Sequence, residues 1–174
     1  LKMADVKANK ADVLNDVEVL INHAHQTVRE ISFNLSPHVL QNYGLVAAVK
    51  SYINKLSEVG PLKIGFEDQG ITDRLGEDVE VVLYRSITEC LTNTVKYASA
   101  NQVNINLNKS DSLIEVDFVD DGVGFDVATT LDQKKGIGLF NMQSRLKAVG
   151  GTVEFISGDG RGTTIKMRIQ ILNL

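Results

Sequence analysis

The most constraining feature of this chain is the alternation of apolar and polar residues in its last segment. Every second residue there is apolar: Ile165, Met167, Ile169 and Ile171. The residues between them are polar, so the segment predicts a strand with one buried face and one solvated face. Similar alternation at 62–66, 103–107 and 114–118, and again from 153, predicts further strands. Because each strand has only one apolar face, we expect a single sheet with helices on one side.

Glycine and proline divide the rest of this region into helices and loops. Residues 38–58 have apolar residues at helical spacing and end at Gly60-Pro61. A central helix is expected over 77–98, and another over 139–149 that ends at Gly150-Gly151. Residues 121–135 are polar and aperiodic, which predicts a mobile loop. The predicted fold class is therefore α+β, a mixed sheet with about three helices on one face.

Residues 1–35 contain neither glycine nor proline and predict one long helix. Apolar residues recur in it at alternating spacings of three and four: Leu14, Val17, Ile21, Ala24, Val28, Ile31 and Leu35. This heptad pattern is typical of a helical bundle or coiled coil, and a helix packed on its own domain is the alternative. We favour a dimerisation bundle over 1–35 and a separate domain over 36–174, with Ser36-Pro37 restarting the helix.

Composition excludes several classes of protein. A net charge of -4 gives no electrostatic footprint for nucleic acid, and we expect no such partner. The sequence has no apolar run of about 18 residues, so we expect no membrane contact by this chain. Cys90 is the one cysteine, which excludes an internal disulfide and fits a cytoplasmic location. The chain starts at Leu1, so we expect a piece of a longer protein, for which anchoring in the inner membrane stays open.

The central helix carries two kinds of surface. One broad arc is apolar and is expected to pack on the sheet: Val79, Leu83, Ile87, Cys90, Leu91, Val95 and Ala98. At about 100° per residue, Glu89, Asn93, Lys96 and Tyr97 fall on a neighbouring arc. An amide oxygen suits Mg²⁺ with its waters and phosphates, a carboxylate can accept a proton, and an ammonium attracts phosphate oxygens. The alternative is a solvated face with an ordinary Arg85–Glu89 pair.

Two glycine-containing turns follow the central helix. Asp120 ends an apolar strand, where its carboxylate can accept a hydrogen bond from an exocyclic amine. Gly122 and Gly124 let the backbone lie against a flat base, although a plain Asp-Gly turn is the simpler alternative. Gly136 and Gly138 open the next helix, whose free amides can bind an anion.

A last glycine turn, residues 160–164, precedes the final strand. The hydroxyl of Thr163 is able to bond Asp120 or a water beside a base, and a tight hairpin is the alternative. Each motif alone is weak, but their order and spacing predict a site for Mg-ATP.

At this point the motifs resemble those of histidine-kinase ATPase domains. Residues 89–98 resemble the N box, 120–126 the G1 box, 136–146 the G2 box and 160–164 the last glycine box. Residues 31–45 resemble the junction of sensor kinases that pair with helix-turn-helix response regulators. The resemblance covers about residues 28–171 and implies a Bergerat-type two-layer α/β sandwich that binds ATP and Mg²⁺.

The resemblance also implies residue roles. Asn93 would coordinate Mg²⁺, Asp120 would read the adenine amine and Glu89 would be the acid–base residue. The remaining residues expected to contact ATP are Lys96, Tyr97, Gly122, Gly124, Gly136, Ile137, Gly138, Leu139 and Thr163. Gly136 and Gly138 would belong to the lid over the phosphates. Tyr97 stands where the family commonly has histidine.

The implied function is transfer of the ATP γ-phosphoryl group to a histidine, for relay to an aspartate of a response regulator. The implied partners are a second copy, through the 1–35 bundle, and that regulator. The family's acceptor histidine is followed by an acidic residue, and neither His23 nor His25 is. We therefore expect no acceptor in this chain and no autophosphorylation. The alternatives are an anti-sigma-factor serine kinase and a gyrase- or chaperone-type ATPase.

Overall fold

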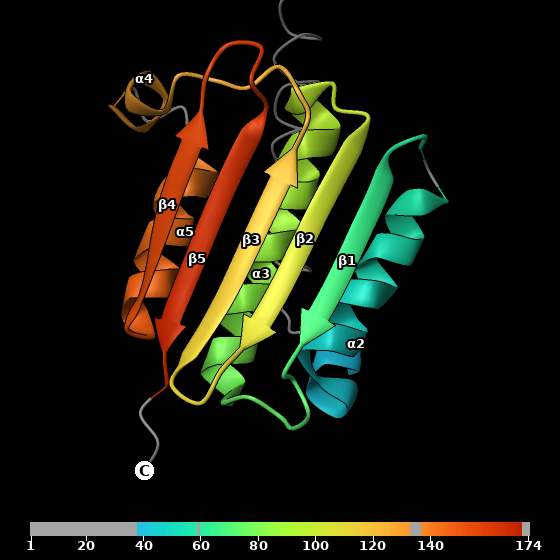
Figure 1. The fold of residues 1–174 in the computed structure, drawn as a ribbon, viewed down its shortest axis with the longest axis vertical. Coiled ribbons are helices and arrows are strands. Elements are labelled where there is room, and N and C mark those ends of the chain that lie inside the picture. The colour runs from blue at the N-terminus through green and yellow to red at the C-terminus, as the bar shows by residue number, and fades with distance from the viewer. Residues whose placement is uncertain (1–37, 59, 133–136, 172–174) are drawn as a thin grey trace, which may run out of the picture. The chain divides into compact units, whose positions relative to one another are not determined.

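The computed structural model describes residues 38–58, 60–132 and 137–171 (Figure 1). The predictions for the helix over 1–35, for the Ser36-Pro37 restart and for Gly136 lie outside these residues.

The described part is built on one five-stranded sheet with the order β1-β2-β3-β5-β4. The strands are β1 (Lys63–Gln69), β2 (Gln102–Lys109), β3 (Leu113–Asp120), β4 (Gly151–Ser157) and β5 (Thr163–Gln170). β1 and β2 are parallel, because a helix crosses over between them, and the other neighbours are antiparallel. This confirms the predicted mixed sheet.

Helices lie on one face of the sheet only (Figure 1). They are α2 (His38–Ser57), α3 (Glu77–Asn93) and α5 (Ile137–Ala148). On the covered face, cross-strand rows such as Ile105, Phe118 and Ile165 pack against Leu83, Ile87 and Leu91 of α3. The opposite face carries the polar half of each alternation, as the sequence predicts.

One predicted loop contains a helix. Residues 121–135 are aperiodic, yet Val127–Asp132 form the short helix α4. The Asp126 carboxylate accepts a hydrogen bond from the Thr129 backbone N–H at 2.6 Å, which caps the start of α4. A helix of six residues is too short to show a helical period, so the sequence pattern missed it.

The end of the central helix also departs from prediction. After Asn93 the chain forms a π-helical turn, η1 (Thr94–Ala98). A π turn contains more residues than an α turn, so the side chains after Asn93 leave the arc calculated at the α-helical angle. Val95 was expected to pack on the sheet, but it is 56% exposed.

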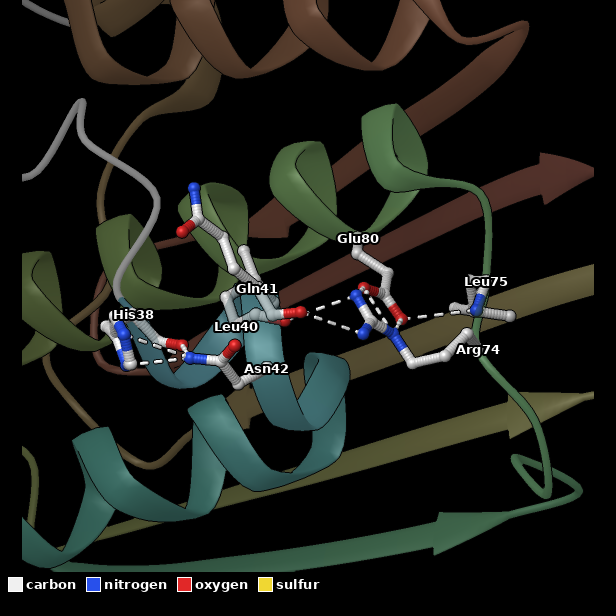
Figure 2. Close-up of polar contacts among 7 residues, drawn as sticks. All are labelled: His38, Leu40, Gln41, Asn42, Arg74, Leu75 and Glu80. Carbon is white, nitrogen blue, oxygen red and sulfur yellow. Dashed lines mark hydrogen bonds and ion pairs between the residues drawn. The ribbon is translucent and has the colours of Figure 1, made fainter.

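An ion pair between the half-exposed Arg74 and the buried Glu80 ties the start of α2 to α3 (Figure 2). The Arg74 guanidinium contacts both carboxylate oxygens of Glu80, with the shortest N–O distance 2.6 Å, and donates to the carbonyls of Leu40 and Gln41. The Leu75 N–H completes the coordination of Glu80. The Leu40 and Gln41 carbonyls belong to the part of α2 before its kink at Gly44, where φ is 80°.

Candidate active site

The acid and the amide of the central helix form a contacting pair. Glu89 and Asn93 lie one turn apart on α3, and both are half-buried. The Asn93 amide nitrogen donates to Glu89 Oε1 at 3.3 Å. Because this bond uses the nitrogen, the Asn93 carbonyl oxygen remains as an acceptor for a ligand. That donor set fits a Mg²⁺ ion that takes most of its ligands from phosphate and water.

Lys96 and Tyr97 lie in the π-helical turn beyond this pair. Both are exposed, and the exposed fraction of Tyr97 is 72%. Within the described residues neither makes a hydrogen bond to Glu89 or Asn93. The structure therefore joins Glu89 to Asn93 but does not join the two exposed residues to them.

Asp120 is the last residue of β3, as predicted, and is 5% exposed. The Gly122 N–H donates to its Oδ1 at 2.9 Å, and the Thr94 hydroxyl donates to its Oδ2 at 3.3 Å. Each carboxylate oxygen therefore has one bond and further lone pairs. The sequence interpretation missed Thr94, because the contact joins η1 to a strand end that follows 26 residues later.

The glycines after Asp120 serve close backbone packing. A Cβ on Gly122 would lie 2.5 Å from the Ala98 carbonyl oxygen. Gly124 has a φ of 70°, and a Cβ there would lie 2.1 Å from the Gly158 carbonyl oxygen. These contacts press the turn after β3 against the end of η1 and against the β4–β5 turn.

Three polar side chains form one cross-strand row on the covered face of the sheet. Asp120 pairs with Thr163, and Thr163 pairs with Ser157 on β4. The Thr163 hydroxyl lies 3.1 Å from the Ser157 hydroxyl. The sequence interpretation missed Ser157, although one signal was present: Ser157 continues the inward positions of Val153 and Phe155 with a polar residue.

Gly138 lies against the acid. A Cβ at Gly138 would lie 2.1 Å from Glu89 Oε1, so only glycine lets the first turn of α5 approach the carboxylate this closely. Ile137 beside it is 66% exposed, whereas Leu139 is buried in the core side of α5. The structure therefore brings Gly138 to Glu89 but directs Leu139 inward.

Arg145 on α5 adds a charge near the pair that the sequence interpretation did not single out. Burial lowers the pKa of the half-buried Arg145, the Glu89 carboxylate opposes that effect, and Arg85 adds to it. Two cationic side chains, Arg85 on α3 and Arg145 on α5, therefore lie close enough to the Glu89 carboxylate to act on it electrostatically. In the described part of the chain, no group of three or more His, Cys, Asp or Glu side chains is placed to hold a metal by itself.

Comparisons with known proteins identify the family of this chain. Residues 78–173 match the family described as "Histidine kinase-, DNA gyrase B-, and HSP90-like ATPase". An uncharacterised sensor-like histidine kinase of Chloroflexus aurantiacus is 34% identical over 91% of this chain and 28% of its own length. Oxygen sensor histidine kinase NreB of Staphylococcus carnosus is 31% identical over 98% of this chain and 49% of its own length. This chain thus spans no more than about half of these curated relatives.

A solved structure shares the fold. The histidine kinase domain of the blue-light activated histidine kinase of Erythrobacter litoralis EL346 superposes with a TM-score of 0.56 at 19% identity, over 71% of this chain and 59% of that one. None of the helices in the described part of this chain is long and apolar enough to cross a membrane. Since the family match covers more than half of the sequence and includes α3, the Asp120 turn and β5, this chain belongs to the histidine kinase-, DNA gyrase B- and HSP90-like ATPases.

Proposed function

We propose that this chain is the ATP-binding catalytic part of a sensor histidine kinase, which transfers the ATP γ-phosphoryl group to a histidine. The observation that carries the proposal is the buried Asp120 carboxylate, held by Thr94 and Gly122 near the helix of the Glu89–Asn93 pair. A nucleotide site needs a group that binds the base and polar groups that bind the phosphates. Asp120 would serve the base, and the Glu89–Asn93 pair would serve the phosphates. The relatives whose names identify them as histidine kinases favour this activity over that of a serine kinase.

At the base end, the Asp120 carboxylate accepts a hydrogen bond from the exocyclic amine of adenine. Thr94 and Gly122 donate to this carboxylate before the nucleotide binds, so it does not have to reorganise. Close backbone packing at Gly122 and Gly124 holds the turn that follows Asp120, and Thr163 lies next to Asp120 in the sheet.

At the phosphate end, the Asn93 carbonyl oxygen is the proposed protein ligand of Mg²⁺. When bound, Mg²⁺ neutralises the charge on the phosphate oxygens. Lys96, Tyr97 and the lid residues Gly136, Ile137, Gly138 and Leu139 complete the proposed ATP contacts. Gly138 and Ile137 start α5, whose free N–H groups suit phosphate oxygens.

In the proposed reaction, a histidine imidazole nitrogen attacks the γ-phosphorus. The bond from the γ-phosphorus to the β–γ bridging oxygen breaks, a phosphorus–nitrogen bond forms, and ADP leaves. Glu89 orients the imidazole and accepts its proton. The phosphoryl group then passes to an aspartate of a response regulator. We propose that the acceptor lies on a bundle helix outside this chain, that 1–35 contributes to a homodimer, and that the reaction occurs in the cytoplasm.

The substitution Asp120→Asn tests the proposal at its base end. The loss of a charge-assisted hydrogen bond should weaken Mg-ATP binding by about 10–100-fold, as measured by calorimetry, without a change in the circular dichroism spectrum. Asp117→Asn is the matched control, because Asp117 lies on the same strand but on the opposite face. Wild-type affinity in Asp120→Asn would contradict the base-reading role.

The activity itself is tested with radiolabelled ATP and a separate bundle carrying the acceptor-histidine helix. We expect label on that bundle and none on this chain alone. Label on His23 or His25 would show that the acceptor assignment is wrong, and acid-stable label on serine would show a serine kinase instead.

A further inference from the structure

We propose that Ser157 is a specificity-determining residue that makes Thr163 a hydrogen-bond acceptor and so helps select a base with an exocyclic amine. The inference rests on the proposed nucleotide site. It concerns how that site rejects a base whose ring carries a carbonyl group at the amine position. Neither the sequence motifs nor the family match assigns a role to Ser157.

The argument starts from the bonds of one hydroxyl group. Ser157 Oγ accepts a hydrogen bond from the Phe125 backbone N–H at 3.0 Å. It donates to the Gly162 carbonyl oxygen at 2.9 Å and lies 3.1 Å from Thr163 Oγ1. A hydroxyl has one proton and two lone pairs. The proton of Ser157 goes to Gly162, and one lone pair goes to Phe125.

The remaining lone pair of Ser157 decides the orientation of Thr163. Since Ser157 has no second proton, the hydrogen bond between the two hydroxyls is satisfied when Thr163 donates and Ser157 accepts. This assignment gives every group a partner, whereas the reverse one leaves the carbonyl of the buried Gly162 without the Ser157 proton. Thr163 Oγ1 then offers only lone pairs to a ligand.

Thr163 and Asp120 therefore present the same polarity. The two residues are direct partners across β3 and β5, and both are buried. The Asp120 oxygens already accept from Thr94 and Gly122 and offer only further lone pairs. A surface that offers only hydrogen-bond acceptors attracts an amine and repels a carbonyl oxygen. Such a site discriminates strongly between the two kinds of base, because the carbonyl of the wrong base stays without a hydrogen bond.

The test compares Mg-ATP with Mg-ITP, whose base has a carbonyl in place of the amine. The full 174-residue chain is titrated with each nucleotide by calorimetry, as wild type and as Ser157→Ala. Without Ser157 the Thr163 proton is free to donate to the carbonyl of ITP. The ratio of the ITP to the ATP dissociation constant should therefore fall about fivefold, which is the effect of one neutral hydrogen bond.

A merely structural role for Ser157 would weaken both nucleotides equally and leave that ratio unchanged, which would overturn the proposal. Thr163→Val provides a second variant, because it removes the acceptor while Ser157 keeps its bonds to Phe125 and Gly162. Valine removes the repelling lone pairs but has no proton to donate, so we expect a smaller fall in the ratio than in Ser157→Ala, and no further fall on adding Ser157→Ala to Thr163→Val. An additional fall in the double variant, or an unchanged ratio in Thr163→Val, would also overturn the proposal.

Ser112→Ala is the matched control, since Ser112 lies in the exposed turn between β2 and β3. Its ratio should equal that of the wild type. A wild-type chain that binds neither nucleotide would contradict the proposed function together with this inference. A wild-type chain that prefers ATP, with the same preference in Ser157→Ala, would contradict the inference alone.

Discussion

At the scale of single residues, the site is organised by hydrogen bonds to carboxylates. A buried charge is costly unless it is bonded, and Asp120 has a donor on each oxygen. The next residue, Asp121, is exposed, and its Oδ1 accepts hydrogen bonds from the backbone N–H groups of both Asn101 and Gln102, at 2.8 and 2.9 Å. Asp120 is the proposed acceptor for the base, while Asp121 anchors the start of β2.

The Asp121 contacts predict a pH dependence of stability. The bond from the Gln102 N–H is the main reason that the pKa of Asp121 lies below its ordinary value. A lowered pKa in the folded state means that the carboxylate stabilises the fold above the unfolded pKa. This contribution is lost as the pH falls through the folded value.

The variant Asp121→Asn should therefore be less stable than wild type at pH 7, and the difference should shrink as the pH falls below about 4. Urea unfolding at several pH values measures this difference in the free energy of unfolding. Asp111→Asn, in the exposed turn between β2 and β3, is the control and should show little difference at any pH. A difference for Asp121→Asn that stays constant with pH would contradict the assignment.

The proposed Mg²⁺ ligand gives a second prediction at this scale. Asn93→Ala should weaken Mg-ATP binding by roughly tenfold or more while affecting metal-free ATP much less. Calorimetric titrations of the chain with ATP, once in the presence of Mg²⁺ and once in the presence of EDTA, measure the affinities for Mg-ATP and for metal-free ATP. Asn54→Ala on the exposed side of α2 should change neither. Equal losses with and without Mg²⁺ would instead assign Asn93 to ATP contact alone.

At the scale of elements, two helices depart from regular geometry. α3 passes into the π-helical turn η1, which exposes Val95 and brings the Thr94 hydroxyl to Asp120. α2 is kinked at Gly44, and the carbonyls of Leu40 and Gln41 before the kink accept hydrogen bonds from Arg74. The π-helical turn places a hydrogen-bond donor in the candidate site. The kink at Gly44 fixes the direction of the first turns of α2.

The kink predicts a specific sensitivity at Gly44. Its φ of 80° is unfavourable for any other residue, and a Cβ there would lie 3.1 Å from Arg74 Cδ. Gly44→Ala should lower the free energy of unfolding by about 1–3 kcal/mol, as measured by urea denaturation. Gly60→Ala is the control, because a Cβ there meets nothing within 4 Å. Equal effects of the two substitutions would show that the kink is not strained for alanine.

At the scale of the whole molecule, one core joins the sheet to the helices that cover it. Cys90 lies on the inner side of α3 and is 2% exposed. Burial, more than the nearby Glu89 and Asp120 charges, raises the pKa of its thiol far above the ordinary value. The native thiol is therefore both inaccessible and protonated.

Cys90 consequently reports unfolding of this core. Since it is the one cysteine of the chain, reaction with a thiol reagent should be slow in the native state and fast in denaturant. Mg-ATP at about one hundred times its dissociation constant should slow native labelling by roughly 100-fold. Fast labelling without denaturant, unaffected by nucleotide, would contradict the packing of α3 on the sheet.

The sequence alone determined the strands, the side of the sheet that the helices cover and the order of the site motifs. These depend on local periodicity and on glycine, proline and aspartate at turns, which short stretches of sequence encode. It predicted Asp120 at a strand end and the proximity of Glu89 to Asn93, because one strand and one helical turn suffice to place them.

Only the tertiary structure decided how distant segments meet. The Thr94–Asp120 bond spans 26 residues, and the Phe125–Ser157 bond spans 32. Both depend on strand register and helix packing, which no local pattern carries. The same holds for the contact of Gly138 with Glu89 and for the Arg74–Glu80 pair. Residue type thus specified which chemical groups are present, and three-dimensional packing decided which of them are paired.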